Sequence, residues 1–514
     1  MPRMADWIAA GMRTWTSAHR CAFAAILSLA VVPAYGAIED HQWCRTKTEH
    51  FDLVTDLDLR RTAELFYSLD RFRAAASALL PGLPPEHPAP LKILVFKSTR
   101  DFALFYRSPN IAGFMRPTLN QSLLAFGPDR NGRYLHAIAF HEYTHYLVRS
   151  RATVNLPVWY EEGLASYLST LDMDPAGVVT VGRGPAPLLA FAVKQPELAL
   201  EDIIAERFRL DWQRHDLSNV YTLAWGIVRF LHHARRPDGT MYAAQLGDML
   251  DAIDQGASSA SAMREHLGFD PSELQDLMRR YYDGSEESTL GVYKFAVNEY
   301  EMPPFDRTCL DGIEARQVLA DAVGFWRADL AGQLYDDILA RKPRHVGALL
   351  GRSRVHPDGE LRKQSAQQAY GEEPLDPAVN LRMAQLSVAP CGDGVIDCVR
   401  DWDAAKAFYQ LALGPDRDRA DAAFGLGMVY LREGQPEEAL EYLAMAYTRA
   451  PWSPRVNYYL GEAFGMLGVV DLARRHLRKT QYWDSEASWR ERAARALARL
   501  DTAAAAAQMP APSE

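Results

Sequence analysis

The sequence predicts two architectures in succession, an α+β domain over roughly the first 300 residues and an all-α solenoid over most of the rest. Three observations support this division. Before residue 300, short apolar or alternating stretches typical of strands are interspersed with amphipathic helical stretches. One of these helical stretches carries two histidines four residues apart, His141 and His145. After about Cys309, small and apolar residues recur at a fixed period, which is typical of stacked helix pairs.

Length and charge bound the classes of function. A chain of 514 residues is long enough for two or three domains with a sizeable core, and a hydrophobic fraction of 48% is ordinary for a globular protein. The net charge is −10, from 56 basic and 66 acidic residues. This mild acidity, without a basic patch interleaved with aromatic residues, argues against a nucleic-acid partner.

The amino terminus, residues 1–37, has the layout of a secretory signal peptide. Arg3, Arg13 and Arg20 precede an apolar run over 21–32, and Ala34-Tyr35-Gly36 places small residues at the −3 and −1 positions of a cleavage site. The run is too short to span a bilayer as a stable helix, and no other stretch reaches that length. We therefore expect a periplasmic or secreted protein with no stable membrane span in the mature chain. The alternative is an uncleaved anchor.

Removal of the signal peptide leaves four cysteines, an even count that suits an oxidising compartment. Cys391 and Cys398 lie close enough in sequence to clip a loop, and Cys44 and Cys309 would then pair by default. Free thiols are the alternative, since the sequence does not decide connectivity. Metal ligation by these residues is not expected, because the chain contains no C-x-x-C pattern.

The elements before the two histidines read as a mixture of strands and helices. Periodicity predicts strands at 50–57 and 91–96, helices at 58–80 and 98–106, and a hairpin with strands at 112–116 and 122–126. After Glu162 the pattern becomes mostly helical.

The segment His141-Glu142-Tyr143-Thr144-His145 carries the clearest chemical signal. Two histidines at i and i+4 lie on one face of a helix, so both imidazoles can reach a single metal ion. A carboxylate from a second helix is the usual third ligand, and Pro157 fits the start of such a helix. Either Glu161 or Glu162 could supply that ligand, and the fourth tetrahedral position would stay open for water.

The run from Gly113 to Tyr167, with His141-Glu142-x-x-His145 and Trp159-Tyr160-Glu161-Glu162-Gly163-Leu164-Ala165, resembles gluzincin-type zinc metallopeptidases. It most resembles the peptidase-MA-like domains that bacteria fuse to tetratricopeptide (TPR) repeats. The resemblance implies an α+β zincin-like metallopeptidase domain over 38–305 that binds Zn²⁺ through His141, His145 and Glu162. Glu161 would then be a surface charge at a helix start. The Gly-x-Met-Glu-Asn signature of large aminopeptidases is absent.

The same resemblance implies roles for other residues. Glu142 would be the general base and proton shuttle. Tyr221 would donate to the oxyanion, with a core tyrosine as the alternative. His232 and His233 read instead as surface or hydrogen-bonded supporting residues. The strand at 122–126 would lie at the sheet edge beside the zinc and pair with an extended peptide, with a plain structural hairpin as the alternative.

The carboxyl-terminal region, residues 310–500, shows TPR-like repeats. Leu426, Gly427, Tyr430, Gly434, Ala439 and Leu443 match the TPR pattern, and Leu460, Gly461, Phe464, Gly468, Ala473 and Leu477 repeat it 34 residues later. We expect helix pairs that stack into a solenoid and bind a protein partner through its groove. Residues 501–514 read as a disordered tail.

These features together predict a periplasmic or secreted zinc-dependent endopeptidase, acting on a protein or peptide substrate through metal-activated water, whose repeats recruit substrate or partner. One alternative is a catalytically inactive, metal-binding TPR scaffold. Another is a zinc hydrolase of a non-peptide amide or ester, which the motif does not exclude.

Overall fold

The structure is a computed structural model that describes residues 41–79, 90–105, 112–128, 135–151, 156–174, 178–182, 199–205, 217–283, 295–296, 306–388, 400–414, 419–483 and 487–508. The predicted signal peptide lies outside the described residues, as do Cys391 and Cys398. Among the described residues, no helix combines the length and apolar character that crossing a membrane requires.

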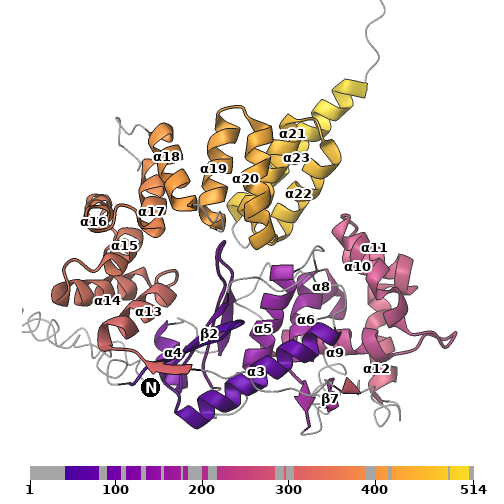
Figure 1. The fold of residues 1–514 in the computed structure, drawn as a ribbon. Helices are drawn as coiled ribbons and strands as arrows, with labels where there is room; N and C mark the ends of the chain where they lie inside the picture. Colours follow the sequence, from indigo (N-terminus) through magenta and orange to yellow (C-terminus); the bar gives the residue numbers. More distant parts are fainter. Residues whose placement is uncertain are drawn as a thin grey trace, which may run out of the picture. The chain divides into compact units, whose positions relative to one another are not determined.

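A six-stranded mixed sheet forms the scaffold of the N-terminal domain (Figure 1). The strand order is β4-β5-β3-β2-β1-β9. β2, β3 and β5 run parallel, whereas β4, β1 and β9 pair antiparallel with their neighbours. The strands are β1 (Cys44–Lys47), β2 (Phe51–Thr55), β3 (Leu91–Val95), β4 (Gly113–Arg116), β5 (Leu123–Phe126) and β9 (Asp306–Cys309). The predicted strands and hairpin are confirmed, and β1 and β9 are additional.

The sheet order corrects the expectation about its edge. The strand predicted at 122–126 corresponds to β5, which lies between β4 and β3 and is therefore an interior strand. At this end of the sheet the edge strand is β4, the first strand of the hairpin, and β9 is the edge strand at the other end. The pairing of β5 with β3 joins segments about 30 residues apart in the chain, and a local hairpin pattern does not specify such a contact.

Two helices pack together beside this sheet, α3 (Leu59–Leu79) and α5 (Leu135–Arg151). The rings of Phe72 on α3 and Phe140 on α5 stack with centroids 4.3 Å apart. Phe51 of β2 meets Tyr143 of α5 edge to face at 5.7 Å. Because Phe140 and Tyr143 are buried in this core, they fix the rotation of α5 about its axis.

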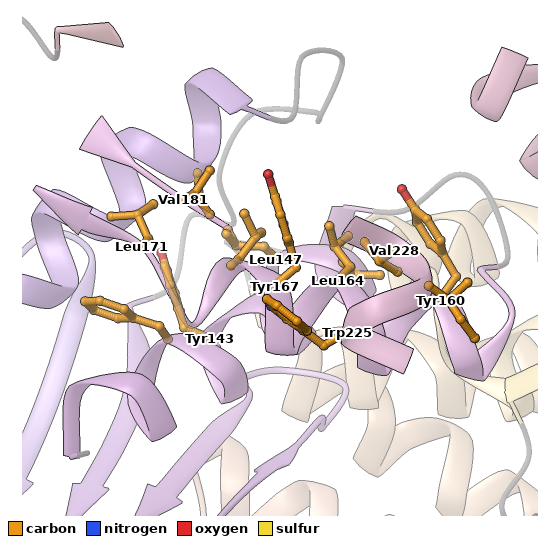
Figure 2. Packing of buried hydrophobic residues seen from close by; sticks show 14 of the residues in the cluster. Tyr143, Leu147, Tyr160, Leu164, Tyr167, Leu171, Val181, Trp225 and Val228 are labelled. Atoms are coloured by element: carbon orange, nitrogen blue, oxygen red, sulfur yellow. The ribbon is translucent and has the colours of Figure 1, made fainter. Parts of the chain in front are cut away.

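The rest of the domain is largely helical. A second, three-stranded antiparallel sheet consists of β6 (Asp172–Met173), β7 (Val178–Thr180) and β8 (Phe295–Ala296). The helices are α4 (Thr99–Phe105), α6 (Val158–Leu168), α8 (Leu200–Ile204), α9 (Leu217–His233), η2 (Tyr242–Gln245), α10 (Leu246–Asp254), α11 (Ser259–Ala262), η3 (Met263–Leu267), η4 (Pro271–Glu273) and α12 (Leu274–Asp283). Figure 2 shows Leu164 of α6 and Val228 of α9 in the cluster of buried apolar side chains that joins these helices.

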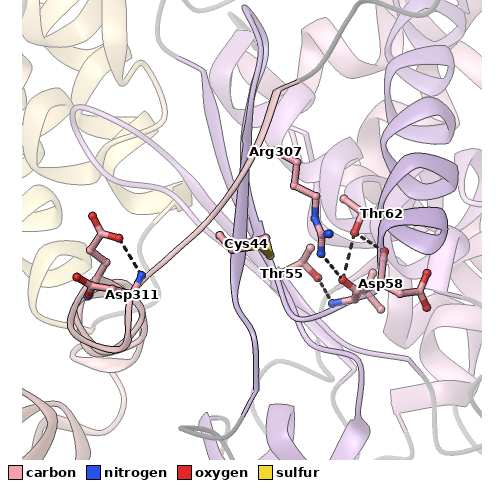
Figure 3. The surroundings of a disulfide bond; sticks show 9 residues. Cys44, Thr55, Asp58, Thr62, Arg307 and Asp311 are labelled. Carbon is pink, nitrogen blue, oxygen red and sulfur yellow. Dashed lines mark hydrogen bonds between the residues drawn. A yellow bond between two sulfur atoms is a disulfide. The ribbon is translucent and has the colours of Figure 1, made fainter.

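A disulfide joins the first strand of the domain to its last. Cys44 of β1 and Cys309 of β9 are direct cross-strand partners, and their sulfur atoms are bonded (Figure 3). On the same strand, the Arg307 guanidinium donates a hydrogen bond to the Leu57 carbonyl oxygen at 2.9 Å. The expected Cys44–Cys309 pair is therefore confirmed. The N-terminal domain reaches Cys309 rather than ending at residue 305, because β9 completes its sheet.

The carboxyl-terminal region consists of antiparallel helix pairs. The helices are α13 (Gly312–Val323), α14 (Ala328–Arg341), α15 (Val346–Val355), α16 (Gly359–Glu372), α17 (Pro377–Ser387), α18 (Trp402–Leu413), α19 (Ala420–Arg432), α20 (Pro436–Arg449), α21 (Pro454–Met466), α22 (Val470–Trp483) and α23 (Ala487–Gln508). Each helix from α13 to α23 packs on the next helix along the chain.

The period of the repeats has a structural basis in two glycines. A Cβ atom at Gly427 would lie 2.6 Å from Leu443 Cγ, and one at Gly461, 34 residues later, would lie 2.6 Å from Leu477 Cγ. Paired helices thus approach most closely at the same position of successive units, as TPR-like repeats require. The predicted helical solenoid is confirmed. The expected disorder of 501–514 is wrong in part, because α23 continues to Gln508.

Candidate metal centre

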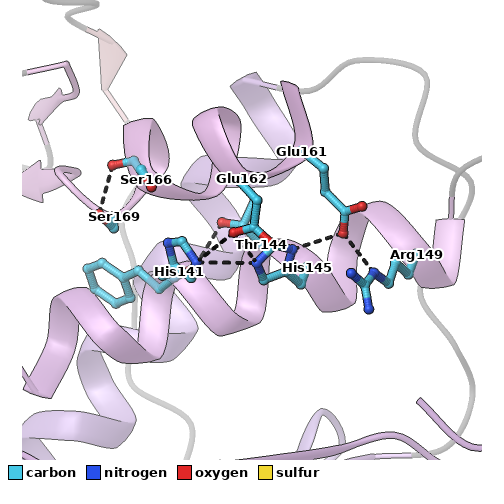
Figure 4. A network of polar contacts seen from close by, with 9 residues as sticks. His141, Thr144, His145, Arg149, Glu161, Glu162, Ser166 and Ser169 are labelled. Atoms are coloured by element: carbon cyan, nitrogen blue, oxygen red, sulfur yellow. Dashed lines mark hydrogen bonds and ion pairs between the residues drawn. The ribbon is translucent and has the colours of Figure 1, made fainter. Parts of the chain in front are cut away.

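The candidate centre begins on α5, where His141 and His145 lie one turn apart (Figure 4). Phe140 and Tyr143 occupy the core-facing side of this helix, so the two histidines project from a different side toward α6. Their Nε2 atoms are 3.2 Å apart. His145 is buried and His141 is partly buried, so solvent reaches the site from the side of His141.

Helix α6 supplies the third group. Pro157 occupies the N-cap position with an extended backbone, and the helix runs from Val158 to Leu168. Gly163 lets α6 approach α9 closely, because a Cβ atom there would lie 2.4 Å from the Ala224 carbonyl oxygen. The adjacent residue, Glu162, points from α6 toward the two histidines of α5 (Figure 4).

The three predicted ligands meet at one point. Glu162 Oε2 lies 3.4 Å from His141 Nε2 and 3.4 Å from His145 Nε2. Together with the 3.2 Å between the two imidazole nitrogens, these are the edges of a nearly equilateral triangle. Two ligand atoms of a tetrahedral zinc with bonds of about 2.0–2.1 Å stand about 3.3–3.4 Å apart. The donor set and its spacing therefore fit zinc.

Glu162 Oε2 provides a second test of this fit. The atom is buried and has no hydrogen-bond partner of acceptable geometry, although Glu162 contacts both histidines. A buried carboxylate oxygen without a hydrogen bond is costly, because it has lost its water without full compensation. A cation at the centre of the triangle would satisfy it.

The charges of the three groups are strongly coupled. Burial alone lowers the pKa of His145, but the neighbouring carboxylates Glu162 and Glu161 outweigh it and raise the pKa of His145 to about 10. Burial alone raises the pKa of Glu162, but attraction to His145 and His141 holds it below its ordinary value. A protonated imidazole does not bind metal, so a cation entering this site would displace the proton from His145.

Glu161 is not the surface charge that the sequence suggested. Its side chain is 2% exposed, and Oε1 accepts hydrogen bonds from His145 Nδ1 at 2.9 Å and from Arg149 Nε at 2.7 Å (Figure 4). Glu161 faces inward because α5 lies against this side of α6. The sequence signal was available: Arg149 follows His145 by one helical turn and can reach the same partner.

Glu142 lies beside the ligands without joining them. Its side chain is partly buried, and desolvation raises its pKa against the opposing charges of His141 and His145. Gly113 of the edge strand β4 approaches this side chain closely, since a Cβ atom there would stand 3.0 Å from Glu142 Cγ. The predicted general base is thus next to both the ligand cluster and the edge of the sheet.

Tyr221 and the two histidines at the end of α9 contact different groups. The ring of Tyr221 lies edge to face with that of His141, with centroids 5.8 Å apart. His232 Nε2 is instead 3.1 Å from the Tyr160 hydroxyl, and His233 Nε2 is 2.9 Å from the Tyr167 hydroxyl. Burial lowers the pKa of both histidines to about 4. Of the two alternatives predicted for these histidines, the hydrogen-bonded one is confirmed, and a role in supporting the metal site stays a prediction.

Comparisons with known proteins bear on the repeats alone. No protein-family model matches the chain, and no curated protein sequence matches it. Similar solved structures include MamA (22% identity, 30% of this chain, 88% of that chain, TM-score 0.24). They also include the thermophilic TPR protein TTC0263 of Thermus thermophilus (19% identity, 36% of this chain, 98% of that chain, TM-score 0.28). A third is the type IV pilus biogenesis factor PilW (17% identity, 37% of this chain, 90% of that chain, TM-score 0.29).

These TM-scores are too low to carry an argument about function. The assignment of TPR-like repeats rests on the helix pairs and on the 34-residue spacing of Gly427 and Gly461. The metallopeptidase resemblance of the N-terminal domain receives no support from these structures, and it rests on the site alone.

Proposed function

We propose that this protein is a zinc-dependent endopeptidase whose TPR-like repeats bind the substrate or a partner protein. The observation that carries the proposal is the triangle of His141, His145 and Glu162, whose edges of 3.2–3.4 Å match tetrahedral zinc. One tetrahedral position is left for water, which is the arrangement of catalytic rather than structural zinc.

The chemistry divides between the metal and Glu142. A zinc ion held by these three residues would supply Lewis-acid polarisation of a carbonyl and acidification of water. Glu142 would accept a proton from the attacking water and deliver it to the nitrogen of the departing amine, so that the proton is conserved.

The edge strand β4 supports a peptide as the substrate. Among the described residues, β5 is its only neighbour in the sheet. Gly127 N donates to Ala112 O, so alternation along the antiparallel ladder turns the N–H and C=O groups of Gly113 and Met115 away from β5. An extended peptide that pairs with these groups would lie beside Glu142 and be held through its backbone.

A second candidate function is a metal-binding interaction scaffold without turnover. The observation that favours it is the repeat region, which accounts for eleven helices of the described chain, because stacked helix pairs of this kind form extended binding surfaces. Glu142 distinguishes the two candidates, because a scaffold that only binds metal has no use for a general base beside the ligands.

The test combines metal content with turnover. Purified protein should contain about one zinc per chain and cleave an unstructured protein such as casein. Glu142→Gln should keep its zinc while losing several orders of magnitude in turnover. Glu201→Gln, on the exposed first turn of α8, removes the same charge away from the ligands and should change neither.

Each other outcome has a definite meaning. A protein that binds no zinc overturns the proposal. Zinc binding without cleavage of casein or of a mixed peptide pool identifies the scaffold. Cleavage that Glu142→Gln leaves unchanged removes the hydrolase assignment, and turnover of esters or small amides but not peptides reassigns the substrate.

A further inference from the structure

Glu161 and Arg149 form an ion pair directly behind one of the three ligands, with Glu161 buried and Arg149 partly buried. The Glu161 side chain is 2% exposed and that of Arg149 is 28% exposed. A single oxygen, Glu161 Oε1, accepts from both His145 Nδ1 and Arg149 Nε. We infer that this pair is a positioning device for the proposed metal site, and that it fixes which nitrogen of His145 faces the metal.

The direction of the hydrogen bond sets the tautomer. An ionised carboxylate can only accept, so His145 must carry its proton on Nδ1. When the ring gives up its second proton, as metal binding requires, Nε2 presents a lone pair toward Glu162 Oε2 and His141 Nε2, the other two ligand atoms. The hydrogen bond on one ring nitrogen decides which nitrogen is available to a metal. Without Glu161, the proton could occupy Nε2 and block that position.

Arg149 makes this arrangement possible at acceptable cost. A lone carboxylate at the depth of Glu161 would be strongly destabilised, and the guanidinium 2.7 Å away compensates its charge. The positive charge of Arg149 also cancels the negative charge of Glu161, so the pair adds no net charge beside the three ligands. The metal would therefore face one net negative ligand, Glu162, rather than two.

The arrangement is asymmetric between the two histidines. His141 contacts His145, Glu162 and the ring of Tyr221, but no second carboxylate among the described residues holds its other nitrogen. A carboxylate thus holds His145 from behind, and none among the described residues does so for His141. The Glu161–Arg149 pair should accordingly affect metal affinity through His145 alone.

The experiment removes the pair without leaving a buried charge. In the full-length protein, Glu161→Leu combined with Arg149→Met deletes both members, and a chelator competition then measures the zinc dissociation constant. We expect that constant to rise about 10- to 100-fold, the usual effect of losing a group that orients a ligand. Glu161→Gln should retain part of the affinity, because its amide oxygen still accepts from Nδ1.

Two further measurements exclude a merely structural role. The visible absorption of the Co²⁺-substituted protein reports ligand geometry, and it should change in the double variant and partly recover in Glu161→Gln. As a control, Asp52→Leu with Arg45→Met removes an ion pair of similar exposure, 9% and 32%, from β2 and β1. That variant should bind zinc like the wild type.

The outcomes separate this inference from the proposed function on which it rests. A double variant that binds zinc as tightly as the wild type, with the same cobalt spectrum, overturns the positioning role and leaves the peptidase proposal intact. A wild-type protein that binds no zinc overturns both.

Discussion

The contact between α6 and α9 should not tolerate a methyl group at Gly163. In Gly163→Ala the new Cβ would lie 2.4 Å from the Ala224 carbonyl oxygen and 2.6 Å from Val228 Cγ2. Ordinary contact begins near 3.4 Å, so α9 must retreat by about 1 Å, the difference between 3.4 and 2.4 Å. Overpacking that moves backbone costs up to about 3 kcal/mol, and the higher helix propensity of alanine returns about 1 kcal/mol.

The expected loss is therefore about 2 kcal/mol, which lowers the melting temperature of a domain of this size by about 4–8 °C. Thermal unfolding followed by circular dichroism measures it. Gly247→Ala, in α10, is the matched control: a Cβ atom there meets nothing within 4 Å, so this variant should be neutral or slightly more stable. If Gly163→Ala melts with the wild type or above it, the reasoning from close approach is refuted.

Three further variants test the site and the repeats. Tyr221→Phe should lower kcat about 100- to 1000-fold with zinc content unchanged, if the hydroxyl stabilises the oxyanion; full activity with a lower melting temperature would make Tyr221 a core residue. Gly113→Ala should displace Glu142, since the added Cβ stands 3.0 Å from its Cγ, and so reduce turnover while zinc is retained; unchanged kcat would contradict this. Gly461→Ala should destabilise the repeats, because its Cβ would lie 2.6 Å from Leu477 Cγ, whereas Gly465→Ala, at 3.4 Å from its nearest neighbour, should not. Urea unfolding of both variants compares them, and equal midpoints would argue against the packing explanation.

Features set by local periodicity could be predicted from the sequence, whereas features set by contacts between distant segments could not. The two histidines one turn apart, and the glycines 34 residues apart, are periodic signals that a helix or a repeat imposes on the chain itself. The position of β5 inside the sheet depends on its pairing with β3, which no periodicity encodes. The prediction that Glu161 is a surface charge was wrong because it also depended on packing between separate elements. A first-turn glutamate is typical of a helix surface, and its burial depends on α5 packing across it.

The family resemblance and the spacing of the residues bear on different parts of the site. The choice of Glu162 over Glu161 came from resemblance to the Glu-Gly-x-Ala pattern of zinc metallopeptidases, and in the structure Glu162 completes the triangle of ligands. The contact of Glu161 with Arg149 could have been anticipated from the spacing of Arg149 and His145 on one helix face. The limit of α23 could not, because an alanine-rich tail reads equally well as a helix or as a disordered end.

The Cys44–Cys309 bond also decides how the N-terminal domain would respond to a break in its chain. Its two halves are 265 residues apart in sequence, and they enclose the ligand cluster, the edge strand and both sheets. A single cut in any loop between them would leave one covalently joined molecule, with both flanking strands still paired at Cys44 and Cys309. Closing so long a loop also disfavours the unfolded chain, by about 5.6 kcal/mol in the chain-entropy view. The bond therefore holds the first and last strands of the domain together whether or not the chain between them is intact.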